Sequence, residues 1–154
     1  MNTSHFPFSV ITANTIFRLI SEDLSGCVNV VRDAYLAHAE GRSVNPHSVF
    51  LRFQDRPNAR IIALPSHLGD PWKTSGIKWI ASYPDNVSKG SPRASAVLLL
   101  NNHENGYPFA CLEGSVISAA RTAASAVLAA SHLRGGNHKA VSYTHLTLPT
   151  KRIV

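Results

Sequence analysis

The residue with the clearest chemical implication is Arg121, the single charge in a run of Ala, Ser, Val, Ile and Leu from Gly114 to Ser131. We expect this run to form a helix without a charged face, and such a helix is packed on most of its sides. A guanidinium stays protonated in proteins, and burying it without a partner is costly. Arg121 therefore requires an anion, either a carboxylate that arrives with a ligand or an internal one such as that of Glu113.

Three further basic residues, Arg52, Lys78 and Arg93, lie in or beside predicted strands. Taken alone, each of them is better explained as an ordinary basic residue on the solvent side of a sheet. Taken with Arg121, the arginines favour forked recognition of carboxylates, and the lysine suits a point contact or proton transfer if burial lowers its pKa. The ligand that this set implies is a small molecule with more than one carboxylate.

The elements that must position these residues are predicted from apolar periodicity and turn residues. Expected strands and helices follow the order strand 9–12, helix 14–20, helix 21 or 23 to 41, strand 48–54, turn 55–58, strand 59–64, strand 76–82, loop 83–92, strand 93–101, turn 102–106, strand 107–112 and the helix that contains Arg121. This pattern predicts an α+β fold. N-terminal helices precede a mainly antiparallel or mixed sheet of five to six strands, and a long helix of small residues follows.

Composition limits the classes of function. The 154 residues are 44% hydrophobic, which is enough for a core, and only 16% charged, which indicates that another domain or a subunit covers part of the surface. The net charge of +6 falls to +4 without Lys151 and Arg152, and the remaining basic residues are scattered. This distribution disfavours a nucleic-acid partner.

The remaining patterns point to a cytoplasmic protein without a metal. Cys27 and Cys111 lack CxxC spacing, which is typical of a reducing compartment. The N-terminus does not resemble a secretory signal, and no apolar run is expected to reach the length of a membrane span. The histidines show no ligand spacing, so no metal site is predicted.

The C-terminal segment 142–154 differs from the rest of the chain. It resembles the translated adapter read-through that ends many gene predictions from metagenomic assemblies, and we expect it to be a non-native tail; the alternative is a natural C-terminal strand.

Several blocks of the sequence resemble the ornithine cyclodeaminase/μ-crystallin family, and most closely its siderophore-biosynthesis branch. These blocks are RIIALPSHLG at 60–69, GIKWI at 76–80, PRASAV at 92–97, GYP at 106–108 and RTAAS at 121–125. The resemblance runs from about residue 9 to about residue 141. It implies that 1–141 form a substrate-binding and dimerisation domain, as found in homodimeric family members.

The resemblance also implies roles for individual residues. Arg52, Lys78 and Arg121 would hold the substrate carboxylate beside the nicotinamide, with Lys78 as the catalytic residue. Thr122 would lie near the cofactor phosphates, and Arg93 would hold a second carboxylate.

The implied chemistry is hydride transfer between an amino-acid Cα and NAD. In the siderophore branch this means oxidation of an amino-acid adduct that releases 2-oxoglutarate and 2,3-diaminopropionate. No GxGxxG loop is present in the sequence, so we expect the Rossmann domain to be absent and the chain to be an inactive N-terminal fragment that does not itself bind NAD. The alternatives are ornithine cyclodeaminase, ketimine reductase or alanine dehydrogenase activity in the parent, or a non-catalytic module that binds carboxylates or dimerises.

Overall fold

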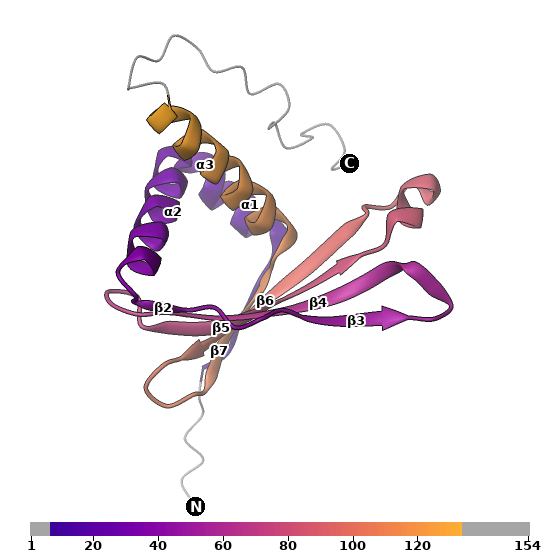
Figure 1. Cartoon of the computed structure of the whole chain (residues 1–154), viewed down its shortest axis with the longest axis horizontal. Helices are drawn as coiled ribbons and strands as arrows, with labels where there is room; N and C mark the ends of the chain where they lie inside the picture. The colour runs from indigo at the N-terminus through magenta and orange to yellow at the C-terminus, as the bar shows by residue number, and fades with distance from the viewer. Residues whose placement is uncertain (1–6, 134–154) are drawn as a thin grey trace, which may run out of the picture.

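Residues 7–133, which the computed structural model describes, form one seven-stranded mixed sheet with three α-helices over one of its faces (Figure 1). The order along the chain is β1 (Ser9–Ile11), α1 (Ala13–Glu22), α2 (Leu24–Ala39), β2 (Ser43–Val44), β3 (Val49–Phe53), β4 (Arg56–Leu68), β5 (Thr74–Ser82), the 3₁₀ helix η1 (Pro84–Lys89), β6 (Ala94–Asn102), β7 (Pro108–Glu113) and α3 (Ser115–Leu133). The α+β class predicted from the sequence is confirmed.

The strand order across the sheet is β1-β7-β6-β5-β4-β2, and β3 also pairs with β4. Only the β1–β7 pair is parallel among the described strands; the others are antiparallel. The long antiparallel ladder β4-β5-β6 therefore forms the centre of the sheet, and the β3–β4 hairpin and the β5–β6 connection extend beyond the helices (Figure 1).

Local hydrogen bonds explain where the helices begin and end. The Asp23 carboxylate caps α2 by accepting a hydrogen bond from the Gly26 N–H at 2.7 Å, and it also accepts one from the Ser25 hydroxyl. Both hydrogen bonds, that of Gly26 more than that of Ser25, lower the pKa of Asp23. Gly41 follows α2 with a φ of 73°, a conformation that glycine adopts without strain. The Glu113 carboxylate caps α3 through the N–H groups of Ser115 and Val116, at 2.6 and 3.1 Å.

The turn between β3 and β4 is shorter than the sequence predicts. Only Gln54 and Asp55 form it, and β4 already begins at Arg56, although Pro57 and Asn58 favour turns. The β3–β4 register shifts between Arg52 and Phe53, so the proline lies in an irregular part of the ladder. Proline is tolerated at such irregularities because no regular N–H bond is lost there.

Two other expectations need correction. The predicted loop 83–92 contains the helix η1, which starts with Pro84 and ends at Gly90 in the left-handed conformation. The two-residue strand β2 was not predicted, because two residues carry no periodicity, and it brings the described sheet to seven strands rather than five or six.

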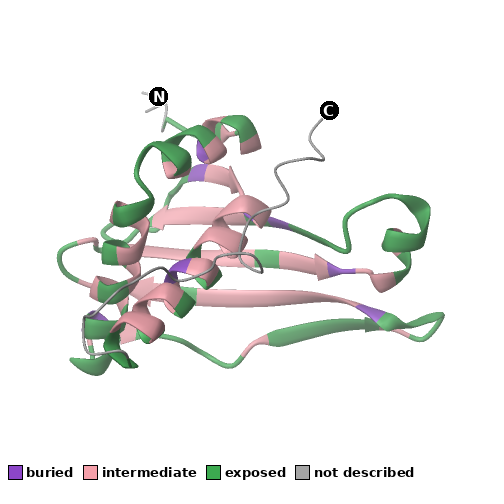
Figure 2. Cartoon of the chain, turned by 90° about the horizontal axis from the view of Figure 1, so that it is seen from above, coloured by how far each residue is buried: buried purple, intermediate pink, exposed green. Residues whose placement is uncertain are grey.

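Few positions of the described chain are buried (Figure 2), and most of these are alanines. The buried apolar residues of the described chain are Ile16, Ala37, Ala59, Ala96, Ala110 and Ala124. Small side chains allow close approach of helices and strands, and Gly114 shows this directly: a Cβ there would lie 2.6 Å from Leu98 Cδ1. The helices therefore lie close to the sheet without large buried side chains.

The expectation that the Arg121 helix is packed on most sides is wrong for the described chain. Helix α3 contacts α1, α2 and β6, yet only Ala124 is buried in it, and Arg121 and Thr122 are exposed. Its length and composition also make it the one helix of residues 7–133 that could cross a membrane, contrary to the expectation that no apolar run has that length. In this fold α3 lies on the sheet beside two other helices.

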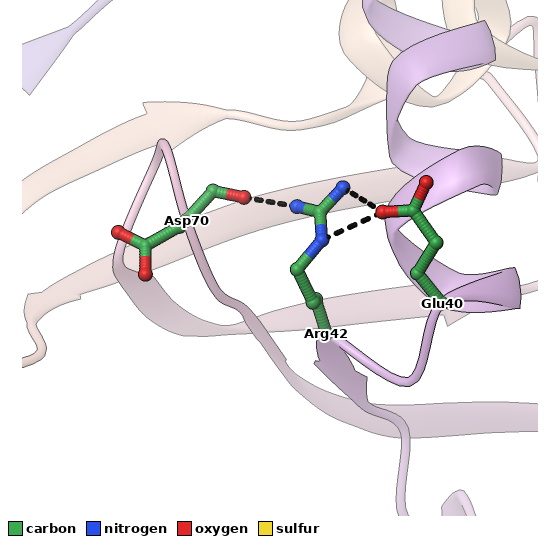
Figure 3. A network of polar contacts seen from close by, with 3 residues as sticks. All are labelled: Glu40, Arg42 and Asp70. Carbon is green, nitrogen blue, oxygen red and sulfur yellow. Dashed lines mark hydrogen bonds and ion pairs between the residues drawn. The ribbon is translucent and has the colours of Figure 1, made fainter.

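A polar network connects the end of α2 to the turn between β4 and β5 (Figure 3). The Arg42 guanidinium donates to the Glu40 carboxylate through Nε, at 2.8 Å, and through a second nitrogen, and also to the Asp70 carbonyl. The Gly69 N–H donates to the Arg42 carbonyl at 2.8 Å. These contacts hold the helical layer against one end of the sheet.

The two faces of the sheet differ. Lys78 contacts α3, so its face is the helix-bearing face. The register places apolar side chains on the opposite face, which no described helix covers; we call this the open face. Its exposed large apolar residues are Val10, Val44, Val49, Leu51, Trp79 and Val97.

Candidate functional site

Lys78 is the centre of the candidate site. It lies in β5 opposite Leu64 of β4 and Leu98 of β6, and it is half-buried between the sheet and α3. Its Nζ donates to the Ser118 hydroxyl at 3.3 Å. The two leucines and the helix remove water from around the amine, which disfavours its charged form.

Arg121 lies one helical turn after Ser118 on α3 and is close enough to act on Lys78. Partial burial lowers the pKa of Lys78, and the positive charge of Arg121 lowers it further. The structure therefore brings together two of the residues that the sequence singled out. Two adjacent cations, one of them partly desolvated, form a site for an anion.

The internal partner considered for Arg121 is not used. The Glu113 carboxylate is engaged by two N–H groups at the start of α3. Arg121 forms no ion pair with any described residue. Because Arg121 is exposed and lacks a carboxylate partner within 7–133, its guanidinium is free to bind an external anion.

Thr122, predicted to lie near the cofactor, is exposed beside Arg121. Its hydroxyl donates to the Ser118 carbonyl at 2.7 Å, an ordinary bond within a helix. As an acceptor, the hydroxyl oxygen can still form a further hydrogen bond. Its role at a cofactor stays a prediction.

Arg52 lies elsewhere on the same face. In the register, Arg52 of β3 is opposite Arg60 of β4, and Arg60 is opposite Ser82 of β5. Ser82 is four residues after Lys78, which is about 13 Å along a strand. This offset is between backbone rows, and the long side chains of Arg52 and Lys78 can each span about half of it. The expectation that Arg52 shares a carboxylate with Lys78 and Arg121 stays a prediction.

Arg93 is exposed and directly precedes β6, and its carbonyl accepts from the Tyr83 N–H at 2.8 Å. This contact puts Arg93 at the same end of the sheet as Arg52, because Ala94 is opposite Ser82. Its predicted role in holding a second carboxylate is untested by this geometry.

Other polar clusters lie away from these residues. His67 and His103 are stacked with ring centroids 4.2 Å apart, and His67 bonds to the Ser75 hydroxyl at 3.0 Å. Within residues 7–133, no three His, Cys, Asp or Glu side chains gather as metal ligands would. A hollow of about 330 Å³ beside this pair is lined by Val44, Pro65 and His67 among others, and neither Lys78 nor Arg121 borders it.

Sequence reasoning missed Ser118, Arg60 and Ser82. Ser118 had a usable signal, because it lies three residues before Arg121 and so faces the same way on a helix. Arg60 lies inside one of the blocks that carried the family resemblance, but its pairing with Arg52 depends on the register. Nothing in the sequence marks Ser82.

The described residues fit a dinucleotide only in part. Residues 7–133 contain no glycine-rich loop between a strand and a helix that could hold a pyrophosphate. They offer one exposed wall, the surface of α3 around Arg121 and Thr122, next to Lys78.

Curated proteins with related sequences include an N-((2S)-2-amino-2-carboxyethyl)-L-glutamate dehydrogenase from Staphylococcus aureus. It is 49% identical over 111 residues, which are 69% of this chain and 33% of that protein. This chain therefore spans about a third of the length of this relative.

Two solved structures share the fold at 30% identity. The Thermococcus litoralis Δ1-pyrroline-2-carboxylate reductase in complex with NADH and L-proline has a TM-score of 0.71 and is matched over 76% of this chain and 35% of that one. An archaeal alanine dehydrogenase dimer with bound NAD has a TM-score of 0.68, over 77% of this chain and 34% of that one.

The family model described as ornithine cyclodeaminase/mu-crystallin matches residues 11–142, which include nearly all the described elements and all the candidate site residues. The resemblance found in the sequence blocks, the shared fold and this match agree. The chain belongs to the ornithine cyclodeaminase/mu-crystallin family.

Proposed function

We propose that this chain is the substrate-binding and dimerisation part of an NAD-dependent amino-acid dehydrogenase, and that the parent enzyme oxidises N-(2-amino-2-carboxyethyl)-L-glutamate. The observation that carries the proposal is the proximity of two cations, Lys78 of β5 and Arg121 of α3, beside Ser118. The name of the Staphylococcus aureus relative supports the choice of substrate.

In this proposal the chain's own residues bind and orient the amino acid. Arg121 presents a forked set of donors to the α-carboxylate, and Lys78 makes a second contact. Because the pKa of Lys78 is lowered, its amine is also suited to proton transfer near the reacting carbon. Ser118 holds the amine in place through its hydroxyl.

NAD would accept the hydride from the substrate Cα. Loss of that hydride together with the N–H proton of the secondary amine would convert the substrate C–N single bond to an imine, which water would hydrolyse to 2-oxoglutarate and 2,3-diaminopropionate. Since 7–133 offer only one wall for a dinucleotide, we expect the isolated chain to be inactive and to bind NADH weakly. Tight, specific NADH fluorescence enhancement on mixing with the purified chain would contradict this.

A hybrid enzyme tests the activity. Residues 7–133 of this chain replace the corresponding part of the Staphylococcus aureus relative, and NADH formation is followed with N-(2-amino-2-carboxyethyl)-L-glutamate, L-alanine and L-ornithine. We expect activity with the first. A hybrid that prefers alanine or ornithine would instead assign this substrate domain to the alanine dehydrogenase or cyclodeaminase alternatives. A folded hybrid that is inactive with all three would favour the non-catalytic alternative.

We further propose that the open face is the interface of a homodimer. Trp79 is 43% exposed and Val10 73% exposed on that face, an arrangement more typical of interfaces than of free surfaces. The archaeal alanine dehydrogenase is described as a dimer. Sedimentation of the chain should show a dimer that Trp79→Glu dissociates, whereas the same change at the exposed Leu19 of α1 should not; a monomeric wild type would contradict the proposal.

The proposed compartment is the cytoplasm. Cys27 and Cys111 are both free in the structure, as expected in a reducing environment.

A further inference from the structure

We propose that Phe50 is a positioning residue for the substrate site: its ring holds the Arg52 guanidinium in the direction of Lys78 and Arg121, so that all three cations can bind one carboxylate. The inference deepens the proposed function and rests on it, because the substrate carboxylate is taken to lie at Lys78 and Arg121. Phe50 lies two residues before Arg52 in β3, and the two side chains therefore share a face of the sheet.

The backbone alone leaves Arg52 far from the other two cations. In the register, Arg52 is opposite Arg60, and Arg60 is opposite Ser82. Ser82 lies four residues after Lys78, which is an offset of about 13 Å along the strands. An exposed arginine can adopt several rotamers, and Arg52 reaches a carboxylate at Lys78 only if its side chain extends along the sheet in that one direction.

The Phe50 ring lies between the two rows. Phe50 is opposite Ile62 of β4, and Ile62 is opposite Ile80 of β5. Ile80 lies two residues after Lys78, so the row of Phe50 is midway between those of Arg52 and Lys78. The Arg52 guanidinium carbon is 5.3 Å from the centroid of the Phe50 ring, within the range of a cation–π contact. Because the guanidinium lies over this ring, the side chain already points toward the Lys78 row.

The charge of Arg60 favours the same direction. Arg52 and Arg60 are directly opposite one another on adjacent strands, and neither forms an ion pair with an acid within residues 7–133. Like charges in this position repel each other, so a guanidinium turned back toward Arg60 is disfavoured. Repulsion on one side and the aromatic ring on the other therefore give the Arg52 side chain a preferred direction.

The ring restrains Arg52 without occupying its hydrogen-bond donors. Phe50 is 47% exposed, and the strands around it extend beyond the helices (Figure 1). A guanidinium that rests on the face of a ring keeps its N–H groups free in its own plane, where a carboxylate binds them in a forked geometry. An acidic partner would instead compete with the substrate for these N–H groups. An aromatic contact therefore suits an arginine that must be oriented and still be available to a ligand.

The test uses the full chain and the proposed substrate, N-(2-amino-2-carboxyethyl)-L-glutamate, as the probe. NMR titrations at low salt follow binding and also the Nε–H resonance of Arg52, which the ring current of Phe50 shifts. Phe50→Leu keeps an apolar side chain and removes the ring. We expect it to weaken binding about two- to fivefold and to abolish the ring-current shift. Phe50→Tyr should retain both, and Phe109→Leu, at an exposed phenylalanine of β7, should change neither.

A double-mutant cycle separates positioning from packing. Arg52→Gln should weaken binding about tenfold or more, because charge-assisted hydrogen bonds to the carboxylate are lost. Adding Phe50→Leu to Arg52→Gln should cause no further loss, because the ring acts only through the guanidinium. Equal losses from Phe50→Leu in both backgrounds would show that the ring contacts the substrate or supports the fold by itself, and this result would overturn the inference.

Failure of the inference is distinguishable from failure of the proposed function. If the wild-type chain does not bind the probe, or if Arg121→Ala leaves binding unchanged, the proposed function fails and the inference fails with it. If Arg121→Ala weakens binding but Arg52→Gln has no effect, Arg52 is no substrate ligand and the inference fails alone. The same holds if Arg52→Gln weakens binding while Phe50→Leu alters neither binding nor the Arg52 resonance.

Discussion

Basic side chains at the two ends of the helix-bearing face have different environments. At the covered end, α3 and two leucines partly desolvate Lys78, and Ser118 holds its amine. At the uncovered end, Arg52 and Arg60 face each other without an acid. The difference shows that one face of a sheet can carry both a partly desolvated cation held by a hydrogen bond and a pair of opposed cations without a described acid.

The largest expected effect comes from removing the cation on α3. Arg121→Ala in the hybrid enzyme should lower kcat/KM by about 100-fold, because two charge-assisted hydrogen bonds worth about 1.5 kcal/mol each are lost. Steady-state kinetics measure this, with Arg18→Ala as the control. Near-normal activity in a folded variant would show that the substrate α-carboxylate does not bind at the covered end.

The next effect concerns the close strand packing beside Lys78. A Cβ at Gly76 would lie 2.5 Å from the Leu99 carbonyl oxygen, which belongs to the backbone and cannot easily move. Gly76→Ala should lower the free energy of unfolding by about 1–3 kcal/mol. Denaturant unfolding checks this against Ser95→Ala at an exposed position of β6, which should change it by less than about 0.5 kcal/mol. If Gly76→Ala and Ser95→Ala have the same free energy of unfolding, the strands beside Lys78 can move apart without a cost in stability.

A smaller effect of opposite sign is expected at the uncovered end. Arg60→Gln should raise the free energy of unfolding of the unliganded chain by about 0.2–1 kcal/mol, because it removes a like-charge pair. The gain should shrink as salt is added. Chemical unfolding at low and high salt measures it, and a loss of stability at both would mean that Arg60 contributes packing rather than repulsion.

The smallest effect is a pH dependence. Because the folded state lowers the pKa of Lys78 from its ordinary value of 10.5, the folded chain loses this proton before the unfolded chain does. Between the lowered pKa and 10.5 the unfolded state binds more protons, so stability relative to Lys78→Met rises with pH. Below the lowered pKa the difference is constant. Unfolding of the wild type and of Lys78→Met at a series of alkaline pH values tests this. If the difference between their free energies of unfolding falls as the pH rises, the folded state does not lower the pKa of Lys78.

Much of the fold could be predicted because its signals are local. Asn102–Gly106, the apolar strand that becomes β6 and the glycine after α2 fix where elements turn or end. The site was predicted only where one element carries the pattern, as for Arg121. The opposition of Arg52 and Arg60 depends on a register shift near Pro57, and the exposure of Arg121 depends on what covers α3; neither property is encoded in a window of sequence.

The tail predicted for 142–154 lies outside the described residues, as do Val141 and the end of the domain predicted for 1–141. The family assignment does not depend on them, since all candidate site residues lie between Arg52 and Thr122.

The long strand β4 has a consequence for how specificity changes. It runs for 13 residues through both ends of the face, so side chains along it can occupy only positions that its pleat allows. Only alternate residues face the helices, and an arginine could move along β4 only in steps of two residues, or about 6–7 Å. Relocating it from position 60 to 62 would bring it one step closer to the row of Lys78, whereas position 61 would send it to the open face. The distance between a basic group on β4 and the amine of Lys78 can therefore change only in discrete increments.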